Sequence, residues 1–71
     1  MGTKYVIYQH IRTVTGIHRF VVWETPTRRL GVSQFERYFK KNPDKEFSLH
    51  EQVTEENILR RIYKGEIQED D

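Results

Sequence analysis

The residues best suited to contact a partner lie between positions 8 and 23, where aromatic, basic and imidazole side chains alternate with others. If residues 4–14 and 17–25 pair around a turn, every second residue of both segments lies on one face. Arginines beside aromatic rings on an open sheet can bind phosphates and stack on bases, and the same residue types are enriched in protein interface hot spots. The predicted contact surface consists of Tyr8, His10, Arg12, Arg19, Val21 and Trp23, extended by Arg28 and Arg29.

The predicted hairpin has its turn at Thr15-Gly16, because β-forming residues flank a glycine that tolerates a positive φ. In this register Arg12 lies opposite Arg19, and like charges opposed across a sheet are destabilising. A bound anion would remove that cost. The alternative is that the aromatic residues of this face pack beneath a helix, while the arginines extend into solvent.

The hairpin is followed by a predicted short helix. Thr25-Pro26 ends the second strand, and residues 27–31 are predicted to form a connecting loop. Ser33 and Glu36 match a capping box, and an aromatic face follows at Phe35, Tyr38 and Phe39. Asn42-Pro43 ends this helix. Its short length means that it must dock on a sheet face to be stable.

The last third of the sequence is predicted to form a strand and a second helix. Apolar residues alternate over residues 47–53, which favours a third strand over the alternative of one helix from Leu49 to Lys64. Residues 54–64 are predicted to be helical, ending at Gly65, and residues 66–71 to form a frayed acidic tail. The expected fold class is therefore α+β, in the order ββαβα, with a single domain over 1–65 and a tail over 66–71.

Composition argues against several classes of function. The chain has 71 residues, no cysteine and three histidines, and the predicted register separates His10 from His18 on opposite faces. We therefore expect no metal and no cofactor. Ser33 and Ser48 are better explained as cap and strand residues than as nucleophiles, so we expect no enzymatic activity. The sequence contains no membrane-spanning apolar run and no signal-peptide pattern, which predicts a cytoplasmic protein without a membrane partner.

The charges are distributed unevenly. Residues 1–45 hold nine basic and three acidic residues, and residues 46–71 hold three basic and eight acidic residues. The segment from Thr15 to Trp23 shares a glycine and a Phe-Val-x-aromatic ending with the octamer of RNA-recognition motifs, but it has one residue too many and lacks the basic start. The comparison with that family therefore fails.

The function expected from the sequence is that of a small protein-binding regulator or inhibitor, of the kind that viruses and mobile elements use. It would act through the hairpin face. Nucleic-acid binding by the same face is the alternative. A homodimer is also compatible with the sequence.

Overall fold

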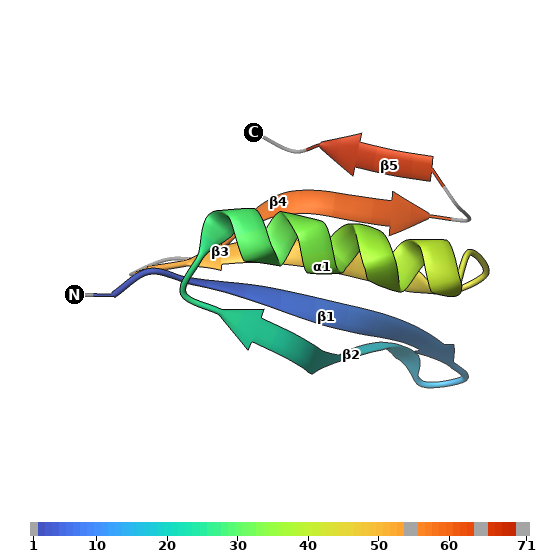
Figure 1. Cartoon of the computed structure of the whole chain (residues 1–71). Coiled ribbons are helices and arrows are strands. Elements are labelled where there is room, and N and C mark those ends of the chain that lie inside the picture. Colours follow the sequence, from blue (N-terminus) through green and yellow to red (C-terminus); the bar gives the residue numbers. More distant parts are fainter. Residues whose placement is uncertain (1, 54–55, 64–65, 70–71) are drawn as a thin grey trace.

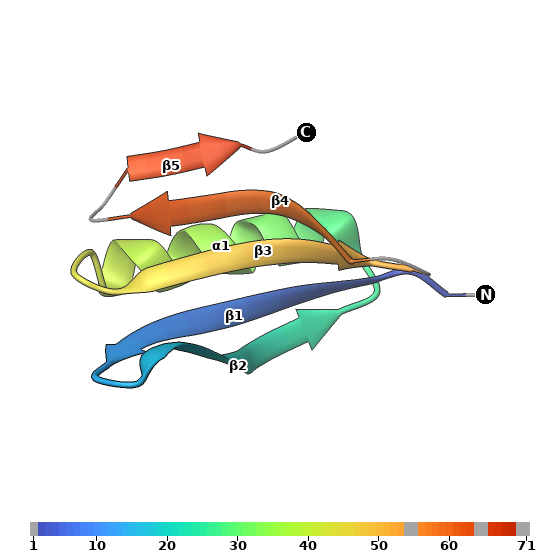
Figure 2. The same cartoon turned by 180° about the vertical axis from the view of Figure 1, so that it is seen from behind.

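The computed structural model describes residues 2–53, 56–63 and 66–69. The elements are β1 (Lys4–Thr13), β2 (Gly16–Thr25), α1 (Arg28–Lys41), β3 (Glu46–Gln52), β4 (Glu56–Tyr63) and β5 (Glu66–Glu69). The strands form one antiparallel sheet in the order β2-β1-β3-β4-β5. Helix α1 lies across one face of this sheet, as the two opposite views show (Figures 1 and 2). We call the other face, which no helix of the described residues covers, the open face.

The coarse α+β prediction is confirmed, including the hairpin and a third strand, which spans Glu46–Gln52 where residues 47–53 were predicted, but the predicted second helix is wrong. Residues 56–63 form β4, and residues 66–69 form β5 in place of the expected frayed tail. Residues 54–55, 64–65 and 70–71 lie outside the described residues, and with them the predicted stop at Gly65.

A bulge explains why β4 resembles a helix in sequence. In the pairing with β3, His50 lies opposite Ile58 and Leu49 lies opposite Arg60, so that Leu59 is an extra residue. Leu59 packs against the core on the helix side, whereas Ile58 shares the open face with His50. An extra residue interrupts strict alternation. It thereby brings residues three apart, Ile58 and Arg61, onto the same face, which is the spacing of a helical stripe.

The core lies between α1 and the three strands nearest to it. Tyr5 and Ile7 of β1 pack with Phe47 and Leu49 of β3, and Phe35 of α1 is fully buried among them. The aromatic face predicted for the helix therefore docks on the sheet as expected.

The helix begins six residues earlier than predicted. Thr27 is its N-cap residue, and the Gly31 N–H donates to the Thr27 carbonyl over 3.0 Å, so residues 28–31 are helical and do not form a loop. Ser33 is exposed inside the helix and does not cap it. The predicted end at Asn42-Pro43 is confirmed, because Asn42 is the C-cap residue. Among the helices in the described part of the chain, none is long and apolar enough to cross a membrane.

The hairpin register differs from the prediction by two residues. Thr13 pairs with Gly16, so Val14 and Thr15 form the turn, and Gly16 follows it with φ of 132°. The Thr13 hydroxyl accepts a hydrogen bond from the Thr15 N–H over 3.3 Å and donates to the Gly16 carbonyl over 3.1 Å. These threonine contacts favour the observed turn. A shift of two residues preserves the faces of the strands.

A bulge in β2 then changes the face of Trp23. Tyr8 pairs with Val21 but Ile7 pairs with Trp23, which leaves Val22 as the extra residue. Trp23 thus shares the helix-side face with Ile7 and packs against the core. The Tyr38 hydroxyl on α1 donates to the Val22 carbonyl over 3.2 Å, so the helix stabilises the bulge.

Candidate functional site: a buried polar network on the open face

The structure brings five of the eight sequence-predicted contact residues together on the open face. Tyr8, His10 and Arg12 of β1 pair with Val21, Arg19 and Ile17 of β2, respectively, and so share one face with them. Arg12 lies opposite Ile17, and not opposite Arg19 as predicted, so no pair of opposed arginines calls for a bound anion.

The other three predicted residues lie elsewhere. Trp23 packs on the helix-side face, which corrects its predicted place beside Tyr8. Arg28 and Arg29 are exposed in the first turn of α1, where the Arg28 guanidinium lies 3.8 Å from the Glu51 carboxylate. They therefore do not extend the open-face surface.

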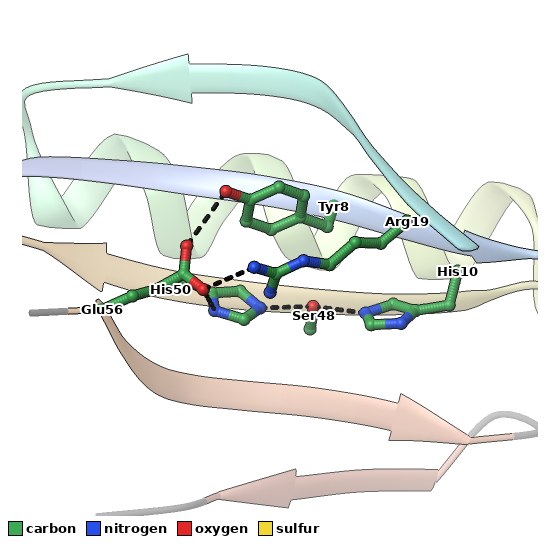
Figure 3. A network of polar contacts seen from close by, with 6 residues as sticks. All are labelled: Tyr8, His10, Arg19, Ser48, His50 and Glu56. Atoms are coloured by element: carbon green, nitrogen blue, oxygen red, sulfur yellow. Dashed lines mark hydrogen bonds and ion pairs between the residues drawn. The ribbon is translucent and has the colours of Figure 1, made fainter. Parts of the chain in front are cut away.

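Six residues from four strands form a continuous polar network on the open face (Figure 3). Its centre is strand β3, which lies between β1 and β4, so that side chains from both neighbours reach it. We call it the open-face network, and its members are Tyr8, His10, Arg19, Ser48, His50 and Glu56.

The centre of the network is buried, although no helix in the described part of the chain covers it. Ser48 and His50 are each 1% exposed. Their cover is formed by long side chains lying over the sheet: the Arg19 guanidinium carbon lies 4.3 Å from the centre of the Tyr8 ring, which in turn contacts the His50 ring edge-on at 4.7 Å. Such stacking of a cation on an aromatic ring is favourable and shields the groups beneath.

The Ser48 hydroxyl lies between two imidazoles. Its Oγ is 2.6 Å from Nε2 of His50 and 2.6 Å from Nε2 of His10. A hydroxyl donates only one proton, so one imidazole accepts from Ser48 and the other donates to it. The two histidines must therefore hold opposite tautomers when both are neutral.

Glu56 determines which of the two histidines accepts the hydrogen bond from the Ser48 hydroxyl. Its Oε1 lies 3.3 Å from Nδ1 of His50, although the two atoms are not aligned as a hydrogen bond. A carboxylate beside Nδ1 favours the tautomer with the proton on that nitrogen, which leaves Nε2 as an acceptor. Ser48 then donates to His50 and accepts the Nε2 proton of His10.

Glu56 is itself held in its charged form. Burial raises its pKa, but hydrogen bonds from Arg19 and Tyr8 outweigh burial, so the pKa of Glu56 is lowered overall. Its carboxylate lies 2.8 Å from the Arg19 guanidinium and accepts a hydrogen bond from the Tyr8 hydroxyl over 3.0 Å.

Both imidazoles are held neutral at neutral pH. Burial lowers the pKa of His50 to about 4, against the opposing attraction of Glu56, and the positive charges of Arg19 and Arg61 add to the effect. Burial and Arg19 also lower the pKa of His10. Two neutral imidazoles can bind the Ser48 hydroxyl from both sides, one accepting its proton and the other donating to its oxygen, without charge repulsion.

The order Glu56, His50, Ser48 resembles the acid, base and nucleophile of an acyl-transfer triad, but the surroundings do not suit that chemistry. A nucleophile must reach its substrate, and Ser48 is 1% exposed. Since β3 is paired on both sides, its backbone N–H groups serve the sheet and do not form an oxyanion site. Both features distinguish the network from such a triad.

Nothing in the described residues points to a metal site. No group of three or more His, Cys, Asp or Glu side chains in this part of the chain is arranged to hold a metal ion. The two imidazole Nε2 atoms that approach each other are both engaged by the Ser48 hydroxyl.

Comparison with known proteins adds no assignment: no family model, no curated protein and no solved structure matches this chain.

Sequence reasoning missed Ser48, His50 and Glu56 as partners of the predicted face. The signal available was the spacing of Ser48 and His50, since residues two apart on a strand share a face. Glu56 carried no comparable signal, because residues 54–64 were predicted to be helical.

Proposed function

We propose that this chain is a small non-enzymatic binding module that acts as a regulator or inhibitor through protein–protein contact on the β1–β2 hairpin. The observation that carries this proposal is the exposure of the outer half of the hairpin: all residues from 11 to 21 are exposed. Exposed apolar side chains that lie close together are typical of interaction surfaces. Five of these residues are large and apolar. Ile17 and Val21 lie on the open face and are 61% and 49% exposed, Ile11 and Phe20 lie on the helix-side face of the same hairpin, and Val14 lies in the turn.

The charges of the hairpin support a protein partner over a nucleic acid. The Arg12 guanidinium lies 2.9 Å from the Glu46 carboxylate, and Arg19 lies 2.8 Å from that of Glu56. Phosphate binding relies on cations that are free to replace counterions. Because these two arginines already have carboxylate partners, the hairpin offers apolar contact more readily than a track of positive charge.

Burial of the polar network supports a non-enzymatic role. The side chains with the chemistry of a nucleophile and a base lie under Tyr8 and Arg19, whereas the exposed residues of the same face are apolar or ion-paired. Such a surface favours shape and apolar complementarity to a partner.

The experiment compares two double variants of the immobilised chain. Ile17→Glu with Val21→Glu places charges on the hairpin, and Leu30→Glu with Val53→Glu is the matched control, because these two residues are also exposed and apolar but lie outside the hairpin. We expect a protein retained from a lysate by the wild type and by the control to be lost with the hairpin variant, after nuclease treatment.

A retained protein that binds both double variants equally would contradict the proposal. So would binding to oligonucleotides alone that falls steeply between about 50 mM and about 200 mM salt, because this dependence is typical of phosphate contacts.

A further inference from the structure

The outer edge of β2 is an exposed strand edge. Strand β2 is the first in the sheet order, and among the described residues no strand pairs with its outer side. An edge of this kind presents unpaired backbone N–H and C=O groups to any extended chain. The opposite edge, β5, is only four residues long. The longer edge of β2 is therefore the better template for strand addition.

Natural edge strands are commonly protected by charged side chains, proline or a bulge. From Gly16 to Val21 the pairing of β2 with β1 is regular, and the bulge comes only at Val22. Arg19 is the one Lys, Arg, Asp or Glu residue in this segment. Its guanidinium turns inward over Tyr8 to reach Glu56, as Figure 3 shows, and so does not guard the edge.

We propose that this edge pairs antiparallel with the same edge of a second copy of the chain, about a twofold axis at Phe20. The proposal rests on the proposed function, because it names the partner of the same hairpin. Strand addition at an exposed edge is an established mode of association, and a twofold interface requires a self-complementary surface.

The side chains next to the axis fit a copy of themselves over three residues, Arg19–Val21, because His18 then lies opposite the bulge residue Val22 of the other copy. Directly opposed residues share a face, so an axis at Phe20 opposes the two Phe20 rings on the helix side. On the open face it places Val21 of each copy beside the aliphatic stem of Arg19 of the other. An axis at Arg19 would instead oppose two like charges.

Charge complementarity also favours a second copy over a charged partner. The only formal charge between Gly16 and Val21 already has an internal carboxylate partner, so the edge offers little to a strongly acidic or basic strand. The pairing would join the open faces of both copies into one continuous surface, with both α1 helices on the other side.

The test is sedimentation velocity of the full chain from about 1 μM to about 100 μM. We expect the wild type to pass from monomer to dimer. Phe20→Lys and Phe20→Glu should each raise the dimer dissociation constant at least tenfold, because they place like charges at the axis. An equimolar mixture of the two variants should dimerise again, because opposite charges then face each other. Val53→Glu is the control and should dimerise like the wild type.

A wild type that stays monomeric over this range would overturn the inference. A dimer that neither charge variant weakens would overturn it as well, since another surface would then form the contact. Failure of the mixture to recover would exclude an axis at Phe20. A monomeric wild type that still retains a protein through Ile17 and Val21 would refute only the dimer and leave the proposed function standing.

Discussion

The Ser48 hydroxyl lies 2.6 Å from Nε2 of His50, two residues along the same strand, on a sheet face without a helix. Both residues are as buried as the core. Polar groups are buried at little cost only where their hydrogen bonds are made. The Ser48 oxygen also accepts a hydrogen bond from Nε2 of His10, so that the hydroxyl both donates and accepts. The open-face network thus stabilises a surface that would otherwise require apolar side chains.

Replacing Ser48 by alanine should destabilise the fold. The substitution leaves the Nε2 atoms of His10 and His50 without their shared partner, and a buried unsatisfied polar group costs about 1–3 kcal/mol. Urea denaturation followed by circular dichroism measures the free energy of unfolding. Ser33→Ala is the control, because Ser33 is exposed in α1 and alanine there should be neutral or slightly stabilising. Equal stability of the two variants would argue against a structural role for the network.

The stability should fall as the pH falls from neutral. The pKa of His50 is lowered to about 4 in the folded protein from its ordinary value of 6.5, so between these values the unfolded chain binds a proton that the folded chain does not. The free energy of unfolding is therefore highest above pH 6.5, where His50 is neutral in both states, and it falls as the pH drops towards 4. The linkage predicts a loss of roughly 2 kcal/mol between about pH 7 and about pH 5. His10, whose pKa is also lowered, adds to the loss.

His50→Gln provides the check on this pH dependence. The amide oxygen of glutamine can still accept from Ser48, but the side chain does not titrate. We expect lower stability at neutral pH and a distinctly flatter decline down to about pH 5. His18→Gln is the control, because His18 is exposed near the hairpin turn. A variant at position 50 with the full wild-type slope would show that other groups cause the decline.

The sequence was sufficient to predict the parts of the fold that follow from local pattern. The hairpin, the aromatic face of the helix and the alternating strand over residues 46–52 all carry one regular period. The failures occur where a bulge adds a residue. Val22 turns Trp23 to the helix side, and Leu59 gives β4 the spacing of a helix. Bulges are stabilised by tertiary contacts, and these are not visible in the local period.

The open-face network could be predicted only in part. The predicted face correctly combined Tyr8, His10 and Arg19, because a register error of two residues preserves the faces. Its carboxylate, Glu56, comes from a strand that was expected to be a helix. Whether Glu56 meets Tyr8 depends on the order of the strands in the sheet. That order is set by packing between residues nearly fifty positions apart, which no local pattern reveals.

Tyr38→Phe should weaken the bulge that positions Trp23. The Tyr38 hydroxyl donates to the Val22 carbonyl over 3.2 Å, and losing such a bond costs about 1 kcal/mol. Trp23 is the only tryptophan, so its fluorescence reports on this region directly. We expect emission shifted to longer wavelength and greater quenching by iodide. Tyr5→Phe is the control, since its hydroxyl binds Glu51, and it should leave the emission unchanged. Unaltered emission in the Tyr38 variant would mean that the bulge holds without this contact.

Gly31→Ala should destabilise the protein although it replaces glycine inside a helix. Alanine at an exposed helical position usually gains up to about 1 kcal/mol over glycine. Gly31, however, is buried where α1 crosses β1, and an added Cβ would lie 3.0 Å from Cβ of Tyr5. That atom is attached directly to the backbone of β1 and cannot move without the strand. Overpacking of this kind typically costs about 1–3 kcal/mol.

We therefore expect a net loss in the free energy of unfolding, measured by urea denaturation, whereas Ser33→Ala on the exposed side of the same helix shows no such loss. A variant at position 31 that is as stable as the wild type would mean that α1 can move away from β1 at no cost.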